Sequence, residues 1–505
     1  MFTMRSAFST LASLLACSLL TLAELAQAES TICKELGSTS NIDIFRSPAI
    51  EYTRVSNDYW STGCSALKPA CILEPTSAGQ LSHIMQMLVA NNESFAVKSG
   101  GHNPNKYFAS IADGALISTS QLNEVVYDAA SGTVGVGPGN KWEDVHKVLD
   151  PLGVTVVGGR IGNVGVGGYL LGGGLSFLST QYGWAANNMV SAEMVLPNGT
   201  IITASNTSNT DVFEAIKGGG SNFGIVTTYV LKTYPIGQIW GGNLIFLGAQ
   251  KTDGILSAVR NFTEHYDDPK AGIIATSELT LGNSTDLWIL FLFYDGPEPP
   301  AGVFDEFLAL EPNVNSCKTR SYSDLLTSNN AFVLKGSVYT IGTETTPLPP
   351  ADRPDIMRAY YDHWHNTSAK HSGVFGMIAS LALQPLPKSL ATVAKQKGGD
   401  LLGFDDDTDR IIFELDYSYV FEDLDSDTVD GAMVEAYSGL RNLVNDYVAD
   451  GSLPDAYLPL FMNDCYFRQD YWGRLKSGSR ELAKKAQVEA DPAGIMTALS
   501  QGFHL

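Results

Sequence analysis

The chain of 505 residues is 44% hydrophobic and 17% charged, and its formal net charge at pH 7 is −22. This length exceeds what a single hydrophobic core usually holds, so two or more folded domains are expected. The acidic balance, without any run of Lys and Arg, argues against nucleic acid or an anionic membrane surface as a partner.

Residues 1–28 are typical of a secretory signal peptide. Arg5 supplies positive charge ahead of the short apolar run 11–22, and residues 26–28 (AQA) offer small side chains for cleavage. No later stretch is long and apolar enough to cross a bilayer. We therefore expect cleavage near Ala28 and a soluble, secreted protein.

Glycosylation sequons fit an exported product. The Asn-X-Ser/Thr pattern predicts N-linked glycans on surface loops. It occurs at Asn92, Asn198, Asn206, Asn261, Asn283 and Asn366.

Five cysteines would remain after cleavage, and an odd number leaves at least one thiol unpaired within a monomer. The preferred disulfide is Cys33–Cys71, which would fix the new N-terminus to the first strand, and Cys64–Cys71 is the rival. Closing the preferred loop would stabilise the fold by roughly 3–4 kcal/mol on the chain-entropy model. The pairing of Cys64, Cys317 and Cys465 is left open.

The region from about 71 to 235 is rich in glycine and in short β-type runs. Apolar residues at helical spacing predict a helix over 78–91, and a second helix is expected over 142–152. The segment 191–205 is predicted to be a hairpin, with Asn-Gly between two apolar runs. Short helices and strands without long βαβ repeats indicate an α+β arrangement.

The region from about 239 to 446 has less glycine, more aromatic residues and longer strands. We expect a second domain here, built on a sheet, with one strand over 411–421. The final residues, from about 453 to 505, have a mixed pattern of their own.

Three glycine clusters occur in the first of these regions, at 99–102, 158–174 and 217–226. Successive backbone N–H groups in glycine turns form concavities that bind phosphate oxygens. The sequence lacks GxxxxGK[ST], and no GxGxxG opens a helix after a first strand. A dinucleotide held by extended glycine loops fits this pattern better.

The ordered series PxCxxxP, KSGGH, GPGNxW, GGR, GVGGxxxGGG and DVFEAIKGGGSNFGIVT resembles the vanillyl-alcohol-oxidase-type, or berberine-bridge-enzyme-like, FAD-linked oxidoreductases, particularly secreted fungal ones. The resemblance implies a two-subdomain, PCMH-type FAD-binding domain over 67–238. It also implies a substrate domain over 239–450, with an antiparallel sheet covered by helices, and a C-terminal segment, 451–505, that returns to the FAD-binding domain.

In that family the histidine of the SGGH motif is bonded to the flavin 8α-methyl group, and here this residue is His102. A tethered cofactor cannot be lost by dilution, which suits an exported enzyme. The other cofactor-binding residues that the resemblance implies are Lys98, Ser99, Gly100, Gly101, Asn103, Ser118, Gly137, Gly139, Gly158, Gly159, Arg160, Gly162, Asn163, Val164, Gly167, Gly168, Gly172, Gly173, Ile225 and Asn463.

The chain departs from doubly tethered members of the family at two positions. Those members carry a cysteine and a histidine where this chain has Ile161 and Tyr169, so we predict a single bond, through His102. Val164 falls where, in the family, the side chain controls oxygen access to the flavin. A small residue there suggests an oxidase that makes hydrogen peroxide.

Oxidation of an alcohol by a flavin needs a base for the hydroxyl proton. Family members use a tyrosine or a glutamate on strands of the substrate domain. In the strand 411–421, Tyr417 and Tyr419 share one face, and Glu414 and Asp416 lie on the other. Tyr417 or Tyr419 is our choice of base, and the alternative is that both tyrosines pack in a core. We expect Asn463 to contact the flavin or the substrate.

These features predict a monomeric secreted oxidase with covalent FAD and O2 as its electron acceptor, acting on a small organic substrate, in fungal secondary metabolism. A carbohydrate or aromatic-alcohol oxidase is the alternative within the class. A catalytically idle flavin-binding protein is the alternative from another class. No metal ion is expected in the site.

Overall fold

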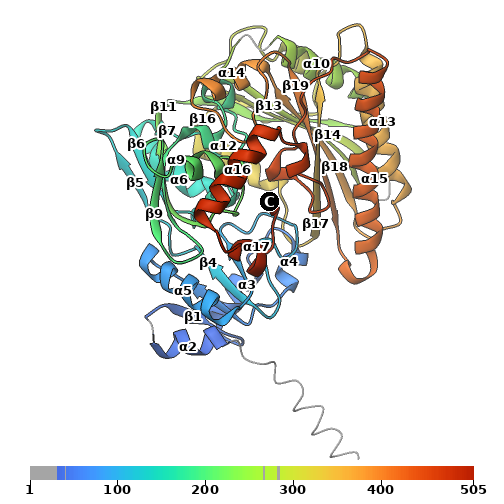
Figure 1. Ribbon diagram of the computed structural model, residues 1–505. Helices are drawn as coiled ribbons and strands as arrows, with labels where there is room; N and C mark the ends of the chain where they lie inside the picture. The colour runs from blue at the N-terminus through green and yellow to red at the C-terminus, as the bar shows by residue number, and fades with distance from the viewer. Residues whose placement is uncertain (1–30, 40, 266–267, 281–284) are drawn as a thin grey trace, which may run out of the picture.

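Three main β-sheets organise the part of the chain that the computed structural model describes, residues 31–39, 41–265, 268–280 and 285–505 (Figure 1). Together with the helices that pack on them, they confirm the α+β class. The predicted signal peptide, 1–28, and the sequon at Asn283 lie outside the described residues. No helix among the described residues is long and apolar enough to span a membrane.

The first sheet has parallel and antiparallel strands in the order β1-β2-β4-β3. Its strands are β1 (Asp43–Phe45), β2 (Cys71–Glu74), β4 (Ala115–Ser118) and β3 (Phe95–Lys98). Its helices are α2 (Thr31–Thr39), α3 (Ile50–Asn57), α4 (Thr62–Ala66) and α5 (Ala78–Asn91). Because β1 pairs with β2, this domain begins ahead of the expected boundary at residue 67.

A disulfide between Cys33 and Cys71 joins α2 to β2 and confirms the preferred pairing. It closes a loop of 38 residues, which stabilises the fold by about 4 kcal/mol on the chain-entropy model. Cys64, Cys317 and Cys465 are free thiols.

The second sheet is antiparallel, in the order β5-β6-β10-β8-β9. Its strands are β5 (Val125–Asp128), β6 (Thr133–Val136), β10 (Ile225–Lys232), β8 (Met189–Val195) and β9 (Ile201–Ser205). Its helices are α6 (Trp142–Leu149), α7 (Val166–Leu171), α8 (Ser179–Tyr182) and α9 (Thr210–Ala215). A short pair, β7 (Val154–Thr155) with β11 (Tyr234–Pro235), leads into the next domain.

The third sheet has eight strands, all antiparallel, in the order β15-β12-β14-β13-β18-β19-β17, with β16 beside β12. The strands are β12 (Ile239–Leu247), β13 (Ala271–Thr280), β14 (Thr285–Tyr294), β15 (Val314–Asn315), β16 (Lys318–Arg320), β17 (Val338–Pro347), β18 (Ile378–Leu386) and β19 (Arg410–Tyr419). Their length places a broad wall beside the first two sheets.

One face of this sheet is covered by three helices, α10 (Thr252–Glu264), α13 (Pro354–Lys370) and α15 (Glu422–Ala449), of which α13 and α15 lie along its outer side in Figure 1. On β19, Phe413, Leu415 and Tyr417 enter the core under these helices. Alternation therefore turns Glu414 and Asp416 to the opposite face, toward the first two sheets.

Five further helices of the described residues complete the fold, and three of them pack on helices of the second sheet. The five are α11 (Asp305–Leu308), α12 (Tyr322–Asn329), α14 (Lys388–Gln396), α16 (Ser477–Ala490) and α17 (Ile495–Leu499). Helix α12 packs on α6, α14 on α8 and α16 on α9, whereas α17 contributes apolar side chains to the core of the first sheet. The C-terminal segment thus ends on the domain that carries the glycine loops.

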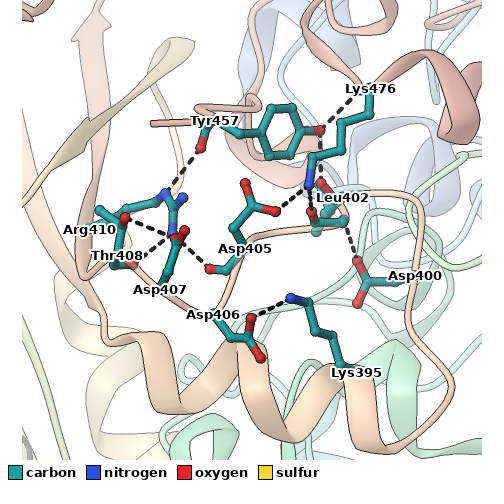
Figure 2. A network of polar contacts seen from close by, with 11 residues as sticks. Lys395, Asp400, Leu402, Asp405, Asp406, Asp407, Thr408, Arg410, Tyr457 and Lys476 are labelled. Atoms are coloured by element: carbon teal, nitrogen blue, oxygen red, sulfur yellow. Dashed lines mark hydrogen bonds and ion pairs between the residues drawn. The ribbon is translucent and has the colours of Figure 1, made fainter. Parts of the chain in front are cut away.

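A polar network fixes the start of β19 to the C-terminal segment (Figure 2). The Arg410 guanidinium donates to the backbone oxygens of Tyr457 and Asp405, each at 3.0 Å. Lys476 donates to the Asp405 carboxylate at 2.5 Å, and the Tyr457 hydroxyl donates to Leu402 O at 2.9 Å. These contacts hold the strand that carries Glu414 and Asp416 in a fixed position.

The sequons differ in their surroundings. Asn92, Asn198, Asn206 and Asn366 are exposed. Asn261 is partly buried, and its amide donates to Glu306 at 3.0 Å. Glycosylation at these positions stays a prediction.

Candidate active site

A cavity of about 510 Å³ lies between the glycine loops and the face of the third sheet that α10, α13 and α15 do not cover. Its first wall comes from the loop after β3, the loop before α7, the loop before β10 and the C-terminal end of the chain. Its second wall comes from β13, β14, β17, β18 and β19. Of the charged side chains that line it, four are acidic, Glu278, Glu414, Asp416 and Asp464, and one, Arg160, is basic.

Most of the residues that the resemblance assigns to the cofactor do line this cavity. They are Ser99, Gly100, Gly101, His102, Asn103, Gly159, Arg160, Val164, Gly167, Gly168, Gly172, Ile225 and Asn463. The others do not line it, and their contact with the cofactor stays a prediction. These are Lys98, Ser118, Gly137, Gly139, Gly158, Gly162, Asn163 and Gly173.

Residues that do not line the cavity make structural contacts elsewhere. The Lys98 ammonium is buried, and it donates to Val55 O at 3.1 Å instead of pointing into the cavity. A Cβ atom at Gly158 would lie 2.4 Å from the Trp142 ring, so this position must be glycine for packing alone. Such residues shape the loops that the cavity residues occupy.

His102 lies in the cavity wall as a buried, neutral imidazole. Burial, with smaller contributions from the nearby Lys335 and Lys141, lowers its pKa to about 4. Its Nε2 atom has no hydrogen-bond partner among the described residues. Trp60 stacks on the imidazole, with ring centroids 4.5 Å apart, and the Tyr339 ring stacks on Trp60 at 4.1 Å. The ring is thus held in place by stacking, and the nearby Asn163 side chain opposes the lowering of its pKa.

The glycine loops approach each other as closely as a backbone can. A Cβ atom at Gly100 would lie 2.5 Å from the Gly165 Cα atom, so neither position tolerates a side chain. A Cβ atom at Gly172 would lie 2.6 Å from Asn463 Oδ1, and this oxygen accepts a hydrogen bond from Gly174 N at 3.1 Å. A side-chain-free wall beside an unpartnered imidazole fits FAD and a bond from His102 to its ring.

The two positions that carry the second tether in other members hold neither a cysteine nor a histidine here. Ile161 lines the cavity, and the Tyr169 hydroxyl donates to Leu175 O at 2.8 Å. No cysteine of the described residues lines the cavity; the free thiol of Cys64 lies against Asn103 O and Pro104 O. His102 is therefore the one tethering side chain that the described cavity offers.

The structure corrects the choice of base. Tyr417 is fully buried on the helix-covered face of β19, and its hydroxyl lies 3.0 Å from that of Ser368. Tyr419 lies in the same core. Neither phenol can reach a molecule in the cavity, whereas Glu414 and Asp416 line it. The predicted alternation of side chains along β19 is confirmed. The choice of the tyrosine face as the one that meets the substrate was wrong, because the other face lines the cavity.

Glu414 and Asp416 are carboxyl groups in the wall that the third sheet contributes to the cavity, and their pKa values are raised. Burial raises the pKa of Asp416 well above its usual value, and the charges of Glu414 and Asp464 raise it further. Burial also raises the pKa of Glu414, although the Arg160 guanidinium and a hydrogen bond with Asp416 oppose this. Glu414 and Asp416 are therefore hydrogen-bonded to each other with raised pKa values, and the two carboxyls titrate as a pair.

The side-chain amide of Gln384 bridges Asp464 and Arg160 by hydrogen bonds. Gln384 donates to the Asp464 carboxyl at 2.9 Å and accepts a hydrogen bond from Arg160 through its oxygen. Burial raises the pKa of Asp464 well above its usual value. The single lining cation is thus already engaged by the protein.

The C-terminal residues 501–505 form a strap over the cavity, and Gln501, Gly502 and Phe503 line it. The Phe503 backbone oxygen accepts hydrogen bonds from Trp472 Nε1 at 2.8 Å and from Asn222 Nδ2 at 2.9 Å. The Phe503 ring meets the edge of Phe108 at 5.0 Å. Figure 1 places this end of the chain between the domains.

Removal of the strap is expected to weaken cofactor retention. In a His102→Ala background, a chain that ends at Ser500 should bind FAD at least tenfold more weakly than the full-length variant, because it loses the Phe503 contacts that close the cavity, and tenfold corresponds to about 1.4 kcal/mol. Fluorescence titration with free FAD measures this. Removal of Leu505 alone is the matched control, and equal affinity of all three chains would contradict the closing role.

Several cavity residues were missed by the sequence analysis. Trp60, Tyr339 and Phe503 come from segments remote from the glycine clusters, and no local pattern marks them. Glu414 and Asp416 did carry a signal, because acidic residues that alternate within an apolar strand are costly to bury without a purpose.

The comparisons with known proteins identify an FAD-binding domain and the family of the chain. An FAD binding domain model matches residues 69–205. An uncharacterized FAD-linked oxidoreductase of Arthroderma benhamiae is 40% identical over 481 residues, which cover 94% of this chain and 95% of the relative. An FAD-dependent monooxygenase of Aspergillus calidoustus is 30% identical over 491 residues, 95% of this chain and 91% of the relative.

The fold also matches a solved structure. Berberine bridge enzyme from Eschscholzia californica superposes with a TM-score of 0.71 over 94% of this chain and 98% of that structure. The sequence identity is 16%, so this likeness concerns the fold, with its FAD-binding domain and its antiparallel substrate sheet.

Proposed function

Since the chain belongs to the FAD-linked oxidoreductases of the vanillyl-alcohol-oxidase and berberine-bridge-enzyme-like family, we propose that it is a secreted oxidase with FAD bonded covalently to His102. It removes two hydrogen atoms from a small organic substrate, a step in fungal secondary metabolism, and O2 is the final acceptor. One observation carries the reaction. The Glu414–Asp416 pair lines the cavity that also contains His102.

In this proposal, the residues of one cavity wall position His102, and those of the other accept the substrate proton. Trp60 and the glycine loops hold the His102 imidazole neutral and oriented. The Glu414–Asp416 pair accepts the proton that leaves the substrate hydroxyl, because its raised pKa suits a base that works near neutral pH. When bound, FAD supplies the two-electron acceptor and returns these electrons to O2.

Val164 supports O2 as the acceptor. This small side chain lines the cavity on the same loop as Arg160. For an alcohol, the balance is one substrate and one O2 converted to one carbonyl product and one H2O2. The second candidate is oxygen insertion, which the description of the Aspergillus calidoustus relative as a monooxygenase favours.

Peroxide release tests the proposal. The purified protein is offered alcohols, phenols and sugars under air, and oxygen consumption and peroxide are followed together. We expect one peroxide per substrate oxidised and no oxygen atom from 18O2 in the product. Labelled product without peroxide would favour the monooxygenase. Bound flavin that no compound reduces would leave a flavin-binding protein without this activity.

A further inference from the structure

Glu278 is a charged side chain in the cavity that the reaction above does not use. It lies on β13, on the same face as Ile274 and Thr276. The pairing register aligns Glu278 with Ser380 on β18, and Ser380 with Asp416 on β19. Since neighbouring strands lie about 4.8 Å apart, Glu278 is about 10 Å from Asp416 across the sheet.

The Glu278 carboxyl is partly buried in the cavity wall, and it has no hydrogen-bond or ion-pair partner among the described residues; burial raises its pKa. A buried carboxyl without a partner is unfavourable, so such a group is retained where a ligand completes it. The one lining cation, Arg160, is bonded to Gln384 on the other side of the Glu414–Asp416 pair.

We propose that Glu278 is a second substrate anchor, which binds a hydrogen-bond donor, a hydroxyl or an ammonium group, at the end of the substrate remote from the oxidised carbon. This assignment rests on the proposed function, because the Glu414–Asp416 pair defines the reacting end. The substrate is then an elongated molecule with donor groups at both ends.

The side chains around Glu278 and the Glu414–Asp416 pair indicate the chemistry of the central part of the substrate. Ala382 and Ile289 line the next row of the sheet, and Ile274 and Phe291 line the row beyond. Ser380 lies between the two anchors, and the apolar side chains lie beside them along the strands, where they fit a hydrocarbon or aromatic body. Among the described residues, these walls offer a carboxylate or phosphate substrate no cation other than Arg160, which is bonded to Gln384, so the acidic lining disfavours anions.

A matched set of probes tests this anchor. 1,8-Octanediol, 8-aminooctan-1-ol, 1-octanol and 8-hydroxyoctanoate share one chain and differ at the far end. Binding to the flavin-loaded protein is followed without O2 by the change in flavin absorbance, which needs no turnover. We expect the diol and the amino alcohol to bind at least tenfold more tightly than 1-octanol, and the acid to bind most weakly.

Variants of β13 test whether the preference for a donor group comes from Glu278. Glu278→Leu should abolish the preference for both donors, and Glu278→Gln should retain it for the hydroxyl and lose it for the ammonium group. Thr276→Val, on the same face of β13, is the matched control and should keep both preferences. For any probe that is oxidised, Glu278→Leu should raise KM and change kcat less than twofold.

Two outcomes would overturn the anchor: equal affinity of the wild-type protein for the diol and for 1-octanol, including no binding of either, or a preference that survives in Glu278→Leu. A preference that depends on Glu278 in a protein that oxidises nothing would overturn the proposed function and support the anchor.

Discussion

Replacement of Asp416 by Asn, or of Glu414 by Gln, is expected to lower kcat by about 10²–10⁴-fold while FAD stays bound, because each change removes a member of the pair that accepts the substrate proton. The two carboxyls titrate as a pair, so the double variant should be little slower than the worse single variant. Stopped-flow reduction of the flavin by the best substrate of the panel measures this step directly.

The control for this prediction is Tyr417→Phe. It removes only the hydroxyl that bonds to Ser368 in the core under the helices, so the rate of flavin reduction should stay within twofold. A large loss in Tyr417→Phe, with normal reduction in both carboxyl variants, would return the role of base to the tyrosine.

The same account fixes the direction of the pH dependence. A base works in its deprotonated form, and burial raises the pKa of both Glu414 and Asp416. The rate of flavin reduction should therefore fall as the pH drops through this raised pKa, above the usual carboxyl range. Asp416→Ala should shift that limb to higher pH, because it removes the hydrogen bond from Asp416 that lowers the pKa of Glu414.

His102→Ala is expected to abolish covalent flavin completely, because no cysteine and no second histidine of the described residues lines the cavity. The flavin should be released by acid precipitation, and the denatured chain should show no fluorescent band on a gel. Cys64→Ser is the matched control: its thiol lies against the loop that follows His102, outside the cavity, and this variant should keep the covalent cofactor. Covalent colour that persists in His102→Ala would assign the tether to another residue.

Local elements were predictable where one physical signal dominated. The helix expected over 78–91 is α5 (Ala78–Asn91), because its apolar stripe packs on the first sheet and the Ser77 side chain caps its first turn. The strand expected over 411–421 is β19 (Arg410–Tyr419), since its alternation matches a sheet residue by residue.

The face of β19 could not be predicted from the same pattern. Alternation says which side chains share a face, but both faces of this strand are covered, one by helices and one by the other domain. Only the packing of α13 and α15 decides that Tyr417 enters the core and Asp416 the cavity. The acidic side chains were the better guide, because a large phenol fills a core at no electrostatic cost.

The glycine clusters show a similar limit. Gly100 and Gly158 look alike in the sequence, yet a Cβ atom at the first would meet the backbone of Gly165 and at the second the ring of Trp142. Both are needed, one beside the cavity and one behind it. Contacts between distant segments, such as Phe503 with Phe108, leave no local pattern at all.

The mass of the peptide that contains His102, taken from the purified wild-type protein, tests the central claim most directly. The account predicts a yellow protein in which this peptide is heavier by one FAD, with fragments that place the added mass on the imidazole. A colourless protein whose His102 peptide has its unmodified mass would contradict it.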